Sequence, residues 1–81
     1  MFFVYVIRST KYNRNYTGLT SNFERRFDEH NTGRNKTTKP YRPFEIILIE
    51  EYPDRPSARK REKYLKSGIG REFIKSKIPQ R

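Results

Sequence analysis

Two short apolar segments in an otherwise polar and basic chain limit the folds that this protein can adopt. Residues 2–7 and 44–49 are rich in the β-branched and aromatic residues that favour strands. In the first segment both alternating sets of side chains are apolar: Phe3, Tyr5 and Ile7 on one face, and Phe2, Val4 and Val6 on the other. Because a strand of this kind is suited to burial on both sides, we expect it inside a sheet.

The length of the chain and its lack of cysteine exclude several classes of protein. The sequence has 81 residues, so we expect one small domain over residues 1–81 that buries about 60–65% of the unfolded surface. A large enzyme with a separate cofactor domain is excluded. The absence of cysteine excludes a disulfide framework, thiol catalysis and a cysteine-based zinc site. The apolar run that ends at Arg8 is too short for a membrane helix and lacks a preceding basic segment, so we expect a cytoplasmic protein without membrane contact.

The charge of the chain points to a polyanionic partner. Lys and Arg number 19 against 9 Asp and Glu, which gives a formal net charge of +10. Such an excess attracts nucleic acid above other partners. Since the basic residues are spread along the chain, we expect a folded basic surface and not a disordered arm. A solvated basic face on a protein with another task is the alternative.

Local signals predict the elements between the two apolar segments. The polar residues 9–15 suit a hairpin loop, and residues 16–18 suit the returning strand. Residues 21–24, Ser-Asn-Phe-Glu, match the S-x-x-E capping box, so a helix should begin at that serine and end near Gly33. A basic loop over residues 34–43 then leads to the second apolar strand.

The last third of the chain is predicted to be helical. We expect a helix over about residues 55–67, stopped by Gly68, and a short final helix over about residues 71–76. Two apolar residues are expected to pack inward, namely Ile69 and Phe73. The order β-β-α-β-α-α predicts an α/β (α+β) fold, with a small, mainly antiparallel three-stranded sheet flanked by helices.

Two pairs of residues could carry chemistry on the first half of the fold. Tyr5 and Tyr16 lie on adjacent predicted strands, so both rings can reach one face of the sheet. The preference of aromatic residues for strands accounts for this pair equally well. Arg26 and His30 are four residues apart and project from one side of the predicted helix. His30 is the only histidine, which excludes a site of several imidazoles, and a single helix histidine is often structural.

Glu62 is the candidate acid on the second half of the fold. Its helical spacing places it on a stripe that faces the core, where a carboxylate is costly unless it is paired or binds a cation. One alternative is an ion pair with Arg26 or Arg61. Another is that Tyr64 and Leu65 define the buried stripe and Glu62 only borders it.

Together these groups suit phosphodiester hydrolysis. A divalent cation, Mg²⁺ or Mn²⁺, on one carboxylate can polarise the phosphate and stabilise the leaving oxygen. An arginine can neutralise charge that develops on the phosphoryl oxygens. A tyrosine or a histidine can orient and deprotonate water. No small-molecule cofactor is needed for this chemistry.

At these residues the chain resembles the GIY-YIG nuclease superfamily, in particular small members similar to the N-terminal endonuclease domain of the UvrC excision-repair protein. Four blocks carry the resemblance over nearly the whole chain: Phe3-Val4-Tyr5, Tyr16-Thr17-Gly18, the helix with Arg26 and His30, and residues 59–66 around Glu62. Each tripeptide alone is a weak signal, whereas four blocks in order at suitable spacing are specific.

The resemblance implies a role for each candidate residue. Tyr5 and Tyr16 would be the active-site tyrosines, one of which assists water activation. Arg26 would contact the scissile phosphate, and His30 would orient or deprotonate the attacking group. Glu62 would hold a single Mg²⁺ or Mn²⁺ ion.

Three positions depart from the family pattern. Gly18 matches the motif glycine, but Phe3 stands where the first motif has a glycine. Leu19 occupies a position where some relatives carry a lysine that assists catalysis. Many members have an asparagine beyond the metal-binding helix, and residues 67–81 contain none. The missing asparagine implies weaker or differently assisted catalysis.

The resemblance also bears on how nucleic acid is held. Larger members attach a separate DNA-binding domain, and 81 residues leave no room for one. We therefore expect contacts mainly to DNA phosphates. The candidate residues are Arg34, Lys36, Lys39 and Arg42 in the basic loop, with Lys63 and Lys66 beside Glu62.

These observations predict a metal-dependent DNA endonuclease that is weakly sequence-specific or directed by DNA structure, with DNA repair or recombination as its setting. The alternative is a non-catalytic or weakly active nucleic-acid-binding module that retains the nuclease fold. A third possibility is a subunit that acts only in a larger repair complex. A chain this short has little surface for two DNA strands, so a homodimer is also left open.

Overall fold

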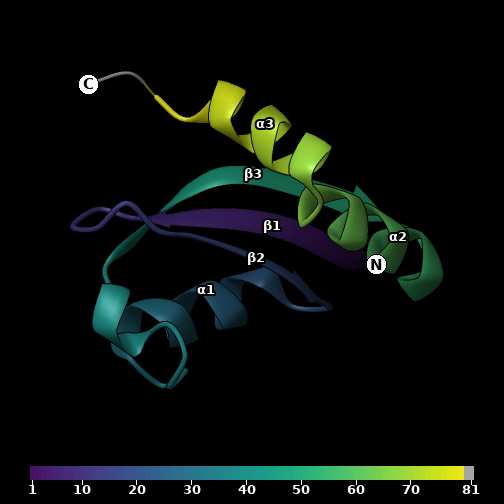
Figure 1. Ribbon diagram of the computed structural model, residues 1–81. Coiled ribbons are helices and arrows are strands. Elements are labelled where there is room, and N and C mark those ends of the chain that lie inside the picture. Colours follow the sequence, from purple (N-terminus) through teal and green to yellow (C-terminus); the bar gives the residue numbers. More distant parts are fainter. Residues whose placement is uncertain (80–81) are drawn as a thin grey trace.

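A small antiparallel sheet forms the centre of the structure, a computed structural model that describes residues 1–79 (Figure 1). Its strands are β1 (Phe2–Ser9), β2 (Asn15–Thr20) and β3 (Phe44–Tyr52). They are arranged in the order β2-β1-β3, and both neighbours of β1 run antiparallel to it. The prediction of a three-stranded antiparallel sheet in the order β-β-α-β-α-α is confirmed.

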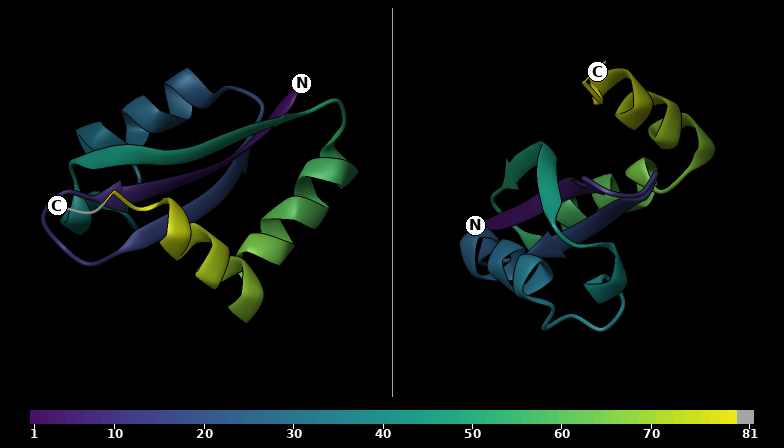
Figure 2. Two further views of the ribbon diagram at one scale, coloured as in Figure 1. Left: turned by 90° about the horizontal axis from the view of Figure 1, so that it is seen from above. Right: turned by 90° about the vertical axis from the view of Figure 1, so that its left-hand side faces the viewer.

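The central strand is buried on both faces, as the alternation of apolar residues predicts. Val4 and Val6 are 0% exposed on one face, and Tyr5 and Ile7 are 1% and 0% exposed on the other. Helix α1 covers one side of the sheet, and α2 and α3 cover the opposite side (Figures 1 and 2). The sheet therefore separates two cores with different compositions.

We call these two cores the aliphatic face and the aromatic face. The aliphatic face consists of Val4, Val6, Ala58, Leu65 and Ile74, with Phe2, Leu19, Ile47, Leu48, Tyr52 and Phe73 packed against them. The aromatic face consists of Tyr5, Ile7 and Phe44, with Tyr16, Phe23, Phe27 and Tyr41 packed against them.

Helix α1 (Phe23–Thr32) begins one residue later than a capping serine would require. The side chain of Asn22, not Ser21, accepts a hydrogen bond from the backbone N–H of Arg25 and caps the helix. Both residue types are good caps, so the pattern S-N-x-E is ambiguous by one position. Gly33 ends the helix in the left-handed conformation (φ 83°), as predicted.

The basic loop that follows contains a short 3₁₀ helix, η1 (Lys39–Tyr41), which the sequence did not predict. Thr38, the residue directly before η1, is almost fully buried, with 2% of its surface exposed. The loop therefore packs against the aromatic face through Thr38.

The two C-terminal helices differ from their predicted bounds. Helix α2 (Arg55–Leu65) ends two residues early, and α3 (Gly68–Lys77) starts three residues early. Ser67 caps α3 by accepting a hydrogen bond from the N–H of Gly70, so Gly68 is the first residue of a helix. The predicted stop at Gly68 is wrong, because α2 ends at Leu65 with Lys66 as its C-cap, and the capping serine of α3 was missed.

Packing of α3 depends on a close approach of two backbones. A Cβ atom added to Gly70 would meet the carbonyl oxygen of Tyr64, and it would lie 2.5 Å from the Cα atom of Leu65. Ile74 is buried on the aliphatic face and Phe73 packs against it, as expected for Phe73. The inward packing predicted for Ile69 is wrong, because this side chain is 71% exposed.

An ion pair links α2 to the edge of the sheet. Arg61 Nε lies 2.8 Å from Glu50 Oε1 on β3, and its second nitrogen lies 3.0 Å from Glu50 Oε2. This bidentate pair has the planar geometry that arginine and carboxylate favour. Within residues 1–79, no helix is both long and apolar enough to cross a membrane.

Candidate active site

Tyr5 crosses from the central strand over the edge strand β2. Its partner in the register is Gly18, and a Cβ atom at Gly18 would lie 2.5 Å from the Tyr5 Cζ atom. Any side chain at this position would displace the Tyr5 ring. Gly18 is therefore a contact site for Tyr5 within β2, not a turn at the end of the strand.

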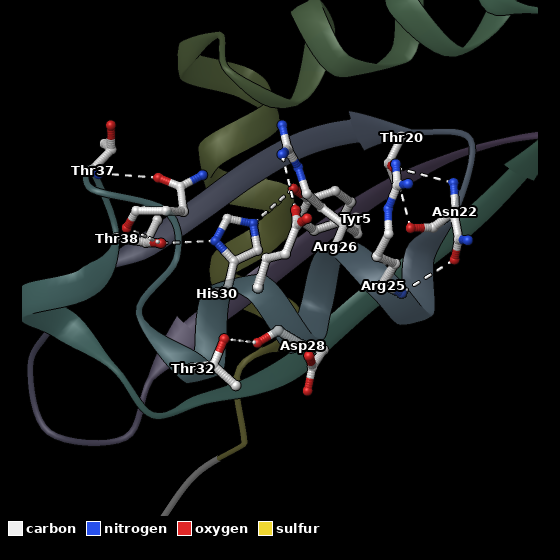
Figure 3. A network of polar contacts seen from close by, with 12 residues as sticks. Tyr5, Thr20, Asn22, Arg25, Arg26, Asp28, His30, Thr32, Thr37 and Thr38 are labelled. Carbon is white, nitrogen blue, oxygen red and sulfur yellow. Dashed lines mark hydrogen bonds and ion pairs between the residues drawn. The ribbon is translucent and has the colours of Figure 1, made fainter.

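On the aromatic face, the Tyr5 hydroxyl forms a hydrogen bond with His30 (Figure 3). The Tyr5 Oη atom lies 2.9 Å from His30 Nε2, and His30 Nδ1 lies 2.8 Å from the hydroxyl oxygen of Thr38. His30 is 0% exposed. Both nitrogens of a buried imidazole thus have a partner, as burial of a polar group requires.

The hydrogen bonds beyond Thr38 assign a direction to this chain of contacts. We assign His30 the tautomer with a proton on Nδ1, because the Thr38 oxygen can then accept from Nδ1–H at 2.8 Å while its hydroxyl points to the carbonyl oxygen of Asn35, 3.5 Å away. His30 Nε2 is then the acceptor of the Tyr5 O–H. The network places a proton acceptor directly behind the Tyr5 hydroxyl.

Tyr16 completes the aromatic cluster on β2. Its ring centroid lies 4.9 Å from that of His30 and 6.3 Å from that of Tyr5. Phe23 of α1 packs edge-on against Tyr5, with the centroids 5.5 Å apart. The expectation that both tyrosines reach one face of the sheet is confirmed.

Arg26 places a guanidinium beside Tyr5, and only some of its hydrogen-bond donors have a partner. One guanidinium nitrogen lies 3.3 Å from Glu29 Oε1, while the Nε atom is buried without a hydrogen-bond partner among residues 1–79. Burial alone lowers the pKa of Arg26, but contacts with Tyr5 and Glu29 outweigh it and raise the pKa. A buried N–H without a partner is costly, and an anionic oxygen would satisfy it.

Burial shifts the pKa values of the two hydrogen-bonded groups toward their neutral forms. Burial, reinforced by Tyr16 and Glu62 and opposed by Arg26, raises the pKa of Tyr5 to about 12. Burial and the charge of Arg26, opposed by Glu29, lower the pKa of His30. At neutral pH the pair is therefore a phenol that donates to a neutral imidazole.

Glu62 approaches this cluster from α2, on the other side of the sheet. It lies with Ala58 and Leu65 on the buried stripe of the helix, so the expectation that it faces the core is confirmed and the reading of Glu62 as a border residue is wrong. Its charge reaches Tyr5, whose pKa it helps to raise. Helix α2 contacts the edge strand β2, and no further strand lies beyond β2 among residues 1–79.

The partners of Glu62 differ from both predicted ion pairs. Arg59 lies 2.9 Å from one carboxylate oxygen, and Lys66 lies 3.3 Å from the other. Arg26 pairs with Glu29, and Arg61 pairs with Glu50, so neither neutralises Glu62. Arg59 and Lys66 contact Glu62 because side chains three and four positions apart along a helix lie on the same side of it.

The predicted phosphate contacts are all exposed, but they are divided between two regions. Arg34, Lys36, Lys39 and Arg42 lie in the loop around η1, and Lys63 and Lys66 lie on or just after α2. Of these, Lys66 also pairs with Glu62. Sequence reasoning missed Thr38 as a partner of His30, since a threonine in a polar loop gives no signal of burial.

The comparisons with known proteins agree with this geometry. Residues 1–72 match the GIY-YIG catalytic domain. The chain belongs to the GIY-YIG family. This membership supports a nuclease-like function, and members of the family are generally dependent on divalent metal ions.

Three related proteins carry the family name UPF0213. A protein of Staphylococcus haemolyticus is 36% identical over 74 residues, which cover 90% of this chain and 89% of that protein. A protein of Natronomonas pharaonis is 40% identical over 53 residues, which cover 64% of this chain and 62% of that protein. The solution NMR structure of a Bacillus halodurans protein matches with a TM-score of 0.56 and 28% identity, over 94% of this chain and 84% of that one.

The donor set fits a GIY-YIG metal site with one protein carboxylate. No group of three or more His, Cys, Asp or Glu gathers anywhere in residues 1–79, so a cage made only of protein side chains is absent from that region. Mg²⁺ commonly binds one or two carboxylates and keeps water or substrate phosphate as its other ligands. Glu62 would take that role with a carboxylate that is buried, while its partners Arg59 and Lys66 are 59% and 54% exposed.

The structure also shows where the residues that depart from the GIY-YIG pattern lie. Leu19 pairs with Val4 and packs against the aliphatic face, where it adds to the core. Phe3 pairs with Thr20 at the end of the hairpin, two residues from Tyr5, and leaves the tyrosine in position. The family's asparagine has no counterpart in α3 or the described residues after it.

Proposed function

We propose that this protein is a metal-dependent endonuclease that hydrolyses phosphodiester bonds in DNA, with Tyr5, Tyr16, Arg26, His30 and Glu62 as its site. One observation carries the proposal: a buried Tyr5–His30–Thr38 hydrogen-bond chain ends beside an arginine whose buried Nε has no partner. Arg26 also interacts with Tyr5 and opposes the rise of its pKa, so a cation lies at the hydroxyl that is hydrogen-bonded to His30.

Water is activated through the pair Tyr5 and His30. With a pKa of about 12, Tyr5 is not a phenolate at neutral pH and cannot act as a base on its own. As its oxygen takes a proton from water, its own proton passes to His30 Nε2, 2.9 Å away. The resulting hydroxide forms a new P–O bond, and the bond to the leaving sugar oxygen breaks. Tyr16, 6.3 Å from Tyr5 between ring centroids, orients the water or the phosphate.

Arg26 holds the scissile phosphate. The side chain of Arg26 is 41% exposed, so its terminal guanidinium nitrogens can donate to a phosphoryl oxygen, and its charge offsets the charge that develops there. The Glu29 contact fixes the guanidinium from the other side at 3.3 Å. Arg26 also favours neutral His30, since a nearby positive charge lowers the pKa of that imidazole.

Glu62 is the residue that would hold the divalent ion, Mg²⁺ or Mn²⁺. When bound, the ion supplies Lewis-acid polarisation of the phosphate and charge stabilisation of the leaving oxygen. Arg59 and Lys66 keep the buried carboxylate neutralised until then. Released from Glu62, these two side chains remain close enough to contact DNA phosphates.

The substrate contacts favour an enzyme of low sequence specificity that acts inside the cell. The exposed cations of the η1 loop and α2 suit phosphate contacts, which carry no sequence information. Selection would therefore rest on DNA structure, as in repair or recombination. A second copy of the chain, or a larger complex, would be needed to engage both strands at once.

The second candidate is a nucleic-acid-binding module without turnover. It is favoured by one observation, that both oxygens of Glu62 are already held by cationic side chains. If Arg59 and Lys66 are not displaced, no divalent ion binds. Steeply salt-dependent DNA binding without nicking would support this candidate.

Nicking of supercoiled DNA in a titration of Mg²⁺ and Mn²⁺ tests the proposed function. We expect Glu62→Gln to lower the cleavage rate by about 10³-fold or more, because several kcal/mol of charge stabilisation is lost, while DNA binding stays within about twofold. Glu51→Gln, which removes the same charge from an exposed position on β3, is the matched control. Equal cleavage by wild type and Glu62→Gln would exclude Glu62 as the metal residue.

A further inference from the structure

A notch lined by three cationic side chains lies where the loop between β1 and β2 meets the loop around η1. Lys11 comes from the first loop, and Lys39, Pro40 and Arg42 come from the second, around a volume of about 380 Å³. All three cations are exposed, and none has an ion pair with another of residues 1–79. Within the same range no acid lines the notch, so its positive charge has no counter-charge of its own.

Contacts between the two loops hold these cations at one place. The backbone N–H of Thr10 donates to the carbonyl oxygen of Pro43 at 3.0 Å. Arg14 donates from Nη2 to the Tyr41 hydroxyl at 3.1 Å, and its guanidinium carbon lies 4.4 Å from the centre of the Tyr41 ring. Lys11 lies between Thr10 and Arg14 in the chain, so tertiary contacts bring it to the cations of the η1 loop.

An anion would offset the repulsion among these cations. Like charges that are held together destabilise a fold, and an anion between them replaces repulsion by attraction. A phosphate group has several acceptor oxygens, which suit the donors of a lysine ammonium and the planar donor fork of an arginine. With a net charge of +10 on the whole chain, the phosphate of a polyanion is the occupant that the charges favour.

The notch lies near the candidate active site but outside it. Lys39 follows Thr38 directly in the chain, and the Thr38 hydroxyl oxygen lies 2.8 Å from His30 Nδ1. None of the residues of the proposed site lines the notch. The molecule measures 32 Å along its longest axis, and DNA rises by about 3.4 Å per base pair, so about ten base pairs span it. One short duplex can therefore reach both places.

We propose that Lys11, Lys39 and Arg42 together bind one backbone phosphate of DNA, away from the phosphate that Arg26 holds. This inference rests on the proposed function for its meaning in cleavage. It adds Lys11, which no sequence motif indicated, and it gives two of the loop cations a shared phosphate. The contact is the same before and during the reaction, so it positions the substrate and does not accelerate the chemical step.

Fluorescence anisotropy in EDTA measures binding to the notch without requiring turnover. The probe is a duplex of about 12 base pairs with hydroxyl ends, which is long enough to span the molecule. The test variant is Lys11→Gln with Lys39→Gln, and Arg42 is kept because it also donates to the carbonyl oxygen of Lys39. The matched control is Arg55→Gln with Lys60→Gln, which removes two exposed charges from α2 outside the notch.

The test variant should lose about tenfold in affinity, while the control should change by less than about threefold because its charges act only at long range. The slope of log affinity against log salt concentration should fall by no more than about 0.9, the value for one phosphate. Lysines that held separate phosphates would lower the slope by about 1.8, and that result would overturn the shared site. Equal losses of affinity in the two variants would overturn it as well.

A second duplex, identical except for phosphates at its 5′ ends, distinguishes two sources of the bound phosphate. The backbone phosphates are the same in both duplexes, so wild type and the test variant should show the same ratio of affinities for them, within about twofold. If the terminal phosphates strengthen binding by wild type but not by the test variant, a strand end occupies the notch and the assignment to a backbone phosphate is wrong.

Cleavage assays with Mn²⁺ then separate this proposal from the proposed function. The test variant should raise KM by about tenfold and leave kcat within about twofold, as expected when a contact of equal strength in ground state and transition state is lost. A lower kcat with unchanged KM would contradict the positioning role. If no DNA is cut but the binding differences hold, the proposed function fails and the notch stands. If DNA is cut and both double variants bind it as wild type does, the function stands and the notch proposal fails.

Discussion

The two faces of the sheet share one central strand but bury different kinds of side chain. On the aliphatic face, Val4 and Val6 meet the branched residues of α2 and α3. On the aromatic face, Tyr5 meets His30 through a hydrogen bond, and a buried imidazole replaces aliphatic packing. Aliphatic contact is nondirectional and tolerant, whereas each buried polar atom must find its partner. The first face can supply stability, and the second can supply chemistry.

Two adjacent residues of β1 face opposite sides of the sheet, so one substitution on each face can test whether stability and chemistry are separate. Tyr5→Phe keeps the ring and removes the hydroxyl that contacts His30. We expect the cleavage rate to fall by about 10³-fold, within the usual contribution of general acid–base catalysis. The free energy of unfolding should fall by only about 1–2 kcal/mol, since one buried hydrogen bond is lost.

Plasmid nicking and thermal unfolding of the same Tyr5→Phe samples measure the two effects. Tyr12→Phe, at a 54% exposed ring, is the control. A Tyr5→Phe protein that cuts within threefold of wild type would show that the aromatic face is a second structural core and nothing more.

Val6→Ala makes the opposite change on the aliphatic face. Two buried methyl groups are lost at a position with 0% exposure, which should destabilise the protein by about 2 kcal/mol. For a domain of this size the midpoint of thermal unfolding should fall by roughly 8–16 °C. Well below that temperature the cleavage rate should stay within about threefold of wild type. A rate loss comparable with that of Tyr5→Phe would show that the two faces are not separable.

Thr38→Val should lower the cleavage rate less than Tyr5→Phe does, and it tests whether the second hydrogen bond of His30 matters on the aromatic face. The change keeps the shape of a buried side chain and removes the hydroxyl that accepts from His30 Nδ1. We expect a cleavage rate about tenfold lower, as for other groups that orient a functional histidine. Thr37→Val, at the exposed neighbouring threonine, is the control and should have no effect.

The pH dependence of the rate reports the direction of this hydrogen bond. Wild-type activity needs neutral His30, whose pKa is lowered by burial and by Arg26, so the rate should rise with pH at values below 6.5 and then level off. Loss of an acceptor at Nδ1 destabilises the imidazolium further, so the acid limb in Thr38→Val should move to lower pH. A move to higher pH would mean that Thr38 donates to the ring.

Most of the fold could be predicted from the sequence because its signals are strong and local. The apolar alternation around Val4 and Tyr5 defined the central strand, and Gly33 defined the end of α1. Errors arose where two rules compete over one or two residues. Ser21 and Asn22 are both capping residues, and Gly68 both follows α2 and begins α3.

The sequence could predict which residues make up the candidate site, but not which partners those residues contact. Tyr5, Tyr16 and Glu62 were found through motif and spacing, and whether they catalyse stays a prediction. The pairing of Glu62 with Arg59 and Lys66 depends on side-chain reach along one helix, which many neighbouring cations could satisfy. Thr38 was missed because its burial depends on how the η1 loop folds back on His30.

The antiparallel hairpin of β1 and β2 has a consequence for how the site assembles as the chain folds. Tyr5 and His30 are 25 residues apart, and Gly18 lies between them, so a short loop closure brings this half of the site together. Glu62 joins only after β3 has crossed back to pair with β1 and α2 has formed. Contacts of low sequence separation form faster, so we expect the phosphate-holding half to be organised before the acidic half. The half of the proposed site that would hold the phosphate is thus local in the chain, whereas the acidic half depends on the return of β3 along β1.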